Sequence, residues 1–129
     1  MSDALASFRS SLDTIEGAYE FMLAYAAQGR ETDAGQTAGP SIRNTLSDLH
    51  AALGEIAELV ANAYPEESDA GFIETLKDDA AKAAASVQVA LNCARISSQL
   101  VDNLNASIHL RAVLTGLFLA DEALNIASK

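Results

Sequence analysis

Apolar residues recur along this chain at alternating steps of three and four, in three long segments that two proline-containing stretches separate. Such steps keep side chains on one face of an α-helix, whereas a half-buried strand requires alternation by two. The spacing therefore predicts an all-α protein whose helices pack at the shallow angles of bundles. The positions are Leu5, Phe8, Leu12, Ile15, Tyr19, Met22 and Ala26; then Ile42, Leu46, Leu49, Leu53, Ile56, Val60 and Ala63; then Ile73, Leu76, Ala80, Ala83, Val87, Ala90, Ala94, Ser97, Val101 and Leu104.

Two stretches interrupt this pattern and predict loops. Residues 29–40 carry three glycines and end on a proline, and residues 64–71 contain the other proline of the chain. Proline removes a backbone donor and glycine favours turns, so a helix is expected to stop at each stretch. Ser68 or Asp69 is expected to cap the helix that follows the second loop, by accepting a free backbone N–H.

A change of phase near residues 102–105 predicts a further break. The later apolar stripe does not continue the earlier one, and Asn103 or Asn105 can cap a new helix there. The alternative is one continuous helix from about Ser68 to Ala127. We favour the break, because four comparable helices close a core better than three unequal ones.

The predicted architecture is an antiparallel up-down-up-down four-helix bundle with a long third helix, made by residues 1–129 as a single domain. Small residues, mainly alanine, occupy the core positions of the third helix. The helices are expected at about 3–28, 41–64, 69–102 and 105–128.

Charge and composition exclude several function classes. The formal net charge is −10, which disfavours binding to nucleic acid and to anionic membranes. The apolar stretches are shorter than the roughly 20 residues that span a bilayer. The N-terminal residues show no secretory signal and the single Cys93 cannot form an internal disulfide, so a cytoplasmic protein is expected.

No catalytic set, metal site or cofactor site is expected. Di-iron bundles need a Glu three residues before a His, but here Ser47 precedes His50 and Ala106 precedes His109. Cys93 has no Cys or His at ligand spacing and is interpreted as a buried, inert thiol on a helix. The chain contains no glycine-rich phosphate loop and no nucleophile-elbow motif, so a non-enzymatic protein is predicted.

One histidine suggests an alternative function. The segment His50-Ala-Ala-Leu-Gly54 resembles histidine phosphotransfer domains, which are four-helix bundles with an exposed histidine followed at three and four positions by Lys and Gly. The resemblance covers His50 and Gly54, and Leu53 stands where the lysine is expected. It implies a phosphorelay role with His50 as the phosphoacceptor. His109 lacks both following residues and is interpreted as a residue at the edge of the bundle.

Residues 18–27 and 112–120 are apolar around the whole circumference of a helix, with one polar side chain in each stretch. A surface helix of a lone domain needs a polar face, so part of this surface is expected to contact another chain. The predicted function is therefore a non-enzymatic helical interaction protein, either a homodimer or an adaptor or chaperone-like subunit that binds another protein. A small-ligand bundle is a third possibility. The interface candidates are Phe21, Tyr25, Leu114, Phe118 and Leu119.

Overall fold

The computed structural model describes residues 2–35, 41–64 and 70–127, and over these ranges the chain is all-helical, without a strand. The predicted fold class is confirmed at this level. Five helices are present in the described part, one more than predicted. They are α1 (Ser2–Ala26), α2 (Ile42–Ala63), α3 (Ala70–Leu91), α4 (Ser98–Asn105) and α5 (Ile108–Ala127).

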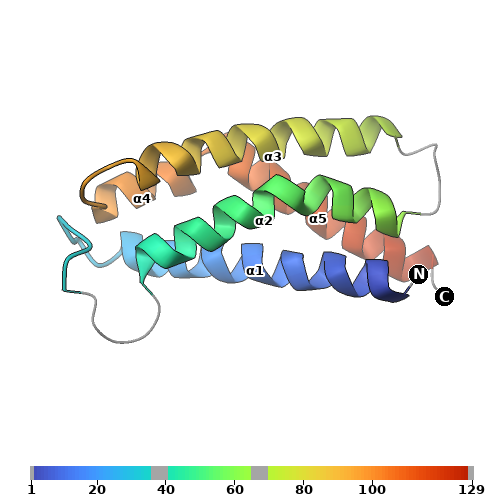
Figure 1. Ribbon diagram of the computed structural model, residues 1–129, viewed down its shortest axis with the longest axis horizontal. Coiled ribbons are helices and arrows are strands. Elements are labelled where there is room, and N and C mark those ends of the chain that lie inside the picture. Colours follow the sequence, from blue (N-terminus) through green and yellow to red (C-terminus); the bar gives the residue numbers. More distant parts are fainter. Residues whose placement is uncertain (1, 36–40, 65–69, 128–129) are drawn as a thin grey trace.

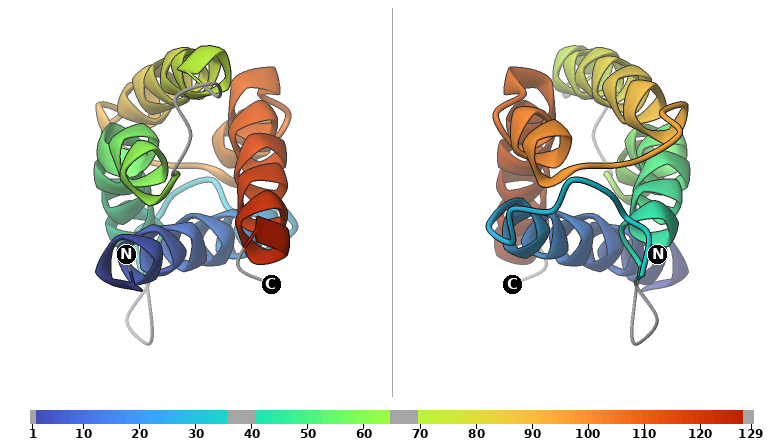
Figure 2. Two further views of the ribbon diagram at one scale, coloured as in Figure 1. Left: turned by 90° about the vertical axis from the view of Figure 1, so that its right-hand side faces the viewer. Right: turned by 90° about the vertical axis from the view of Figure 1, so that its left-hand side faces the viewer.

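The long helices lie side by side around one interior. In Figure 1, α1 runs from right to left, α2 returns, α3 runs left again, and α4 and α5 return together. End-on views place α1, α2, α3 and α5 on four sides of the molecule (Figure 2). Helix α1 packs mainly against α2, α2 also packs against α3, α3 against α5, and α1 against α4.

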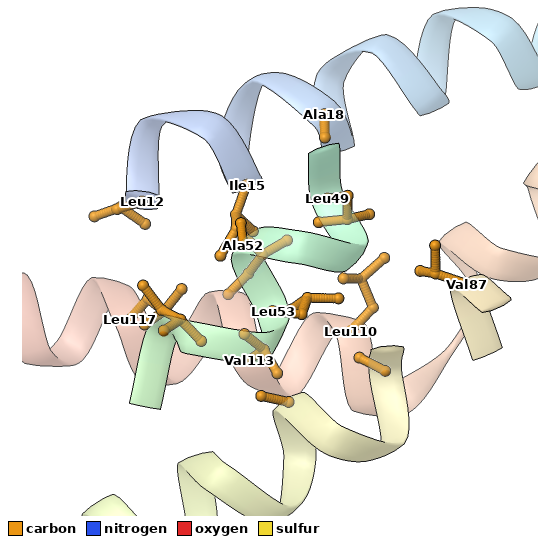
Figure 3. Packing of buried hydrophobic residues seen from close by; sticks show 14 of the residues in the cluster. Leu12, Ile15, Ala18, Leu49, Ala52, Leu53, Val87, Leu110, Val113 and Leu117 are labelled. Atoms are coloured by element: carbon orange, nitrogen blue, oxygen red, sulfur yellow. The ribbon is translucent and has the colours of Figure 1, made fainter. Parts of the chain in front are cut away.

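The interior is filled by most residues of the three-and-four stripes together with the inner side of α5, although Ala94 of the third stripe is exposed. In Figure 3, Ile15 of α1, Leu53 of α2 and Val113 of α5 point toward one another, and all three are buried. Helix α3 contributes mainly alanines, as expected, and this allows close approach. A Cβ added to Gly116 of α5 would lie 3.4 Å from Leu76 of α3, so a small residue suits this crossing.

The predicted third helix over 69–102 is wrong, because α3 ends at Leu91. The backbone turns at residues 92–97, and Ser97 caps the new helix α4 by accepting from the Leu100 N–H at 3.0 Å. Contacts from elsewhere in the chain hold this turn. Arg43 at the start of α2 donates to the carbonyl oxygens of Leu91, at 3.1 Å, and Cys93, at 3.2 Å. It thereby satisfies acceptors that a helix end leaves free.

The second break also differs from the prediction. Helix α5 begins at Ile108 rather than near residue 105, and neither candidate asparagine caps it. Asn105 is a buried residue of α4 whose side-chain amide donates to the Met22 carbonyl of α1 at 3.2 Å. Asn103 is exposed on α4. The proposed caps Ser68 and Asp69 lie outside the described residues.

One aspartate connects the first loop to the turn after α3. Asp33 Oδ1 accepts from the Ile96 N–H at 2.9 Å, and Oδ2 accepts from Arg43 Nε at 3.1 Å. The hydrogen bond from Ile96, together with the Arg43 charge, lowers the pKa of Asp33 below its ordinary value of 3.8. The ionised carboxylate is therefore part of what ends α3 and positions α4.

Replacing Asp33 with Asn is expected to lower the free energy of unfolding at neutral pH by about 1–2 kcal/mol, because a charge-assisted hydrogen bond and an ion pair are lost. A carboxylate with a lowered folded-state pKa stabilises above its ordinary pKa, and that stabilisation disappears as the pH falls through the lower value. The difference between Asp33→Asn and wild type should thus shrink below about pH 4.

Urea unfolding followed by circular dichroism across this pH range measures the difference. Asp102→Asn, at an exposed position of α4, is the control and should have little effect. A constant difference down to pH 2 would show that the Asp33 charge does not hold the turn.

Candidate interaction surface

The outer side of α5 carries a stripe of exposed apolar side chains. Ile108 is 76% exposed, Leu119 60% and Ile126 65%. The steps of 11 and 7 residues between them are close to whole numbers of helical turns, so the three side chains lie on one side of α5. The opposite side carries Leu110, Val113, Leu117, Ala120 and Leu124 and is buried in the core. Helix α5 therefore carries large apolar side chains on its outer side as well as on its inner side, and Arg111 and Glu122 are exposed beside the outer ones.

Phe118 lies on the flank of this stripe. It is 49% exposed, and its helical neighbour Asp121 forms an ion pair with Arg9 of α1, with 3.0 Å between Oδ1 and Nε. Since residues three apart lie on the same side of a helix, Phe118 faces the α1 edge of α5. We call Ile108, Phe118, Leu119 and Ile126 the α5 face.

Two predicted interface residues belong to the core instead. Tyr25 is fully buried and Leu114 is 7% exposed, so neither side chain is available to a partner. The prediction treated both as part of a surface formed by the first and last helices. Phe21 is half-buried and lines a hollow between α1 and α2. The structure therefore does not bring Phe21 together with Phe118 and Leu119.

Tyr25 is buried because it joins the end of α1 to the turn before α4. Its hydroxyl donates to the Ile96 carbonyl at 2.6 Å, and its own carbonyl accepts from the Ser98 hydroxyl at 2.7 Å. The Ser98 hydroxyl oxygen in turn accepts from the Arg30 N–H at 2.8 Å. Burial raises the pKa of Tyr25, although the Arg30 side chain opposes this, so the phenol stays neutral. The pattern of apolar residues carries no signal of these bonds.

Acidic groups flank the α5 face on its α1 side. Burial raises the pKa of Glu16, and the neighbouring carboxylates Asp13, Glu20 and Asp121 raise it further. Arg9 pairs with one member of this group. The flank is consequently a region of negative charge beside an apolar surface.

The two histidines and the cysteine occupy separate places. His50 is partly buried on α2, and Leu53, where the phosphotransfer pattern has lysine, is a core residue. The phosphotransfer role stays a prediction. His109 lies at the start of α5, with Nδ1 3.6 Å from Asp79 Oδ1 on α3. Cys93 is wrongly predicted as a buried helical residue, since it is partly exposed in the turn after α3 and its thiol faces the Val89 carbonyl at 3.4 Å.

No three His, Cys, Asp or Glu residues are grouped to hold a metal ion within the described ranges. None of the helices described there combines the length and the apolar character needed to cross a membrane. The α5 face holds four of the six large apolar side chains that are exposed in the described ranges, and the other two are Leu23 of α1 and Val89 of α3. The helical spacing of the sequence is enough to place Ile108 and Ile126 on the same side of the helix as Leu119. The predicted interface candidates omit both because they come only from residues 18–27 and 112–120.

Comparison with family models, curated proteins and solved structures found nothing that matches this chain. Its function is therefore argued from its own residues.

Replacing Tyr25 with Phe tests the assignment of this residue to the core. The change leaves the buried Ile96 carbonyl without its donor and is expected to lower the free energy of unfolding by about 1–2 kcal/mol. The oligomeric state at equal concentration should not change. Chemical denaturation measures the stability and light scattering measures the oligomeric state. Loss of association without loss of stability would show that Tyr25 is an interface residue and not a core residue.

Proposed function

We propose that this protein is a helical interaction protein that associates with a second copy of itself through the α5 face. The observation that supports the proposal is the exposure of four large apolar side chains on one helix whose other side already fills the core. In this interpretation α4 and α5 together form the fourth arm of an antiparallel up-down-up-down bundle. The outer side of that arm is left for a partner.

The energetics favour a modest interface. Covering a half-exposed Leu, Ile or Phe contributes about 1–2 kcal/mol, and four such residues on each copy are comparable with the cost of association. A dissociation constant in the micromolar range, on the order of 1–100 μM, is therefore expected. Large apolar residues scattered singly need no explanation, but four exposed on one helix are more than such scatter, with Arg111 and Glu122 exposed among them.

Two-fold symmetry suits this helix. A dyad perpendicular to α5 near Leu117 would pair Ile108 with Ile126 of the partner subunit, because the two positions are equidistant from residue 117. The same arrangement would bring Arg111 close to Glu122 of the partner subunit. These are the charged residues on the outer side of α5, and their signs are opposite.

Replacing Leu119 with Glu is expected to weaken self-association at least about tenfold, because a charge would be buried in an apolar contact. The control Ala81→Glu adds the same charge to an exposed position of α3 and should leave association unchanged. Sedimentation velocity over a concentration series measures both. A monomer for the wild-type chain at 200 μM, or equal association for the two variants, would rule out the α5 face as a self-association site.

Salt provides a second test of the same proposal. Each copy carries a formal net charge of −10, so the two copies repel one another and the repulsion is screened at higher ionic strength. Dimerisation through an apolar face should strengthen when NaCl rises from about 0.05 to 0.5 M. Weakening over that range, measured by sedimentation equilibrium, would show that ion pairs such as Arg111–Glu122, and not the apolar contacts, hold the two copies together.

A further inference from the structure

A small hollow between α3 and α4 adjoins the α5 face. Its volume is about 250 Å³, and none of its described lining residues is charged. Ser107, one of these residues, directly precedes Ile108 of the α5 face, so the hollow borders that face at the start of α5. Figure 1 shows α3 ending beside α4, which it contacts. The residues that line the hollow are Ser86, Val89, Ala90, Leu100, Asn103, Leu104 and Ser107.

The size of the hollow excludes a small-molecule site of the usual kind. Such sites have volumes of about 300–1,000 Å³ and a few polar groups that orient the ligand. This hollow is smaller, and its walls include the buried side chains of Ala90 and Leu104. Val89, which also lines it, is 63% exposed. The hollow therefore suits one apolar side chain, as a hole between helices accepts a knob from a facing helix.

The α5 face needs additional apolar surface to form a stable interface. Burying a large apolar side chain removes about 100 Å² of apolar surface, so four that are half to three-quarters exposed supply roughly 250 Å² per copy. A standard interface buries about 800 Å² per partner. Val89 is an exposed large apolar residue outside the α5 face, and it lies in the hollow that borders that face. The hollow is thus the adjoining surface through which the interface can extend.

The charges beside the α5 face differ between its two ends. Arg111 lies three residues after Ile108 and on the same side of the helix, so the end that borders the hollow is positive. Glu122 lies four residues before Ile126, so the other end is negative. Antiparallel contact between two copies brings opposite charges together, whereas parallel contact brings like charges together. This complementarity selects a second copy in the antiparallel orientation as the occupant.

The spacing along α5 identifies the side chain that reaches the hollow. Ile126 lies nine residues after Leu117 and Ile108 lies nine residues before it, which is about 14 Å in each direction. A dyad near Leu117 therefore places Ile126 of the partner subunit beside Ile108, at the border of the hollow. The same operation places Ile126 of the first copy at the hollow of its partner. Such reciprocity is what a two-fold interface requires.

We propose that the α3–α4 hollow receives the side chain of Ile126 from a second copy of this chain, with the reciprocal contact at the other end of α5. The proposal rests on the proposed self-association through the α5 face, and it adds to that association an orientation and a register. It also includes Val89 of α3 in the interface, and it gives the exposed Ile126 a specific contact.

Shortening Ile126 tests the contact. Ile126→Ala is expected to weaken self-association at least about tenfold, because two apolar contacts are lost from each dimer. The matched control is Leu23→Ala, which shortens an exposed large apolar side chain of α1 outside both the hollow and the α5 face. The control should change the dissociation constant by less than about twofold. Sedimentation velocity measures both variants after circular dichroism verifies that they are folded. Equal effects of the two changes overturn the proposal.

Cross-linking tests the register directly. Two chains, both with Cys93→Ser, carry either Asn103→Cys in the hollow or Ile126→Cys, and they are mixed at equal concentration with a short bismaleimide. A covalent heterodimer is expected, because the two cysteines lie close together across the interface. Ala81→Cys, at an exposed position of α3 outside the hollow, replaces Asn103→Cys in the control and should give none. Preferential cross-linking of Ile126→Cys chains to one another would show a parallel contact and overturn the proposal.

The failure of this proposal is distinguishable from the failure of the self-association on which it rests. A wild-type chain that is monomeric at about 200 μM overturns both. If the wild type associates and Leu119→Glu weakens the association, the α5 face is supported. In that case, an Ile126→Ala variant that behaves as Leu23→Ala does, or the absence of the heterodimer, overturns only the assignment of Ile126 to the hollow.

Discussion

The turn between α3 and α4 determines the path of the rest of the chain and therefore which side of α5 faces the core. Asp33 and Arg43, from the first loop and the start of α2, hold the backbone of residues 91–96 through hydrogen bonds and an ion pair. Because these contacts end α3 at Leu91, the remaining residues return along the bundle as two helices. The start of α5 at Ile108 then determines which of its sides enters the core and which side remains outside.

The regular part of this fold is predictable from spacing alone. The stripe of α2 identifies seven of the eight residues that this helix buries, because a long amphipathic pattern admits one helical face, whereas the stripe of α1 identifies four of seven. The break after Leu91 is not predictable in this way. The apolar pattern continues through Ala94 and Ser97, and the contacts that override it come from residues about 50 and 60 positions away in the sequence. Local propensity carries no trace of such distant partners.

The interaction surface could be predicted in part, for the same reason. Phe118 and Leu119 lie outside the core as the helical phase requires, while Tyr25 lies inside it, since it follows the buried Ala18 and Met22 at helical steps of four and three. Tyrosine combines an apolar ring with a polar end, so its position depends on whether a buried acceptor is within reach. That acceptor exists because α3 stops early. The spacing of α1 therefore permits the burial of Tyr25, and the early end of α3 supplies the acceptor for its hydroxyl.

The exposed side chains of α5 and the unpaired polar atoms of the interior affect the stability of the isolated chain differently. Exposed leucine and isoleucine on α5 cost the fold little, because they are equally exposed when it unfolds. By contrast, Ser11 Oγ of α1 and Asn105 Oδ1 of α4 are buried without a hydrogen-bond partner in the described chain, and each weakens the folded state. Local violations of this kind concentrate at functional sites in natural proteins. Here the two atoms lie on different helices and neither belongs to the α5 face, so exposure, and not a cost to the isolated fold, is what distinguishes that face.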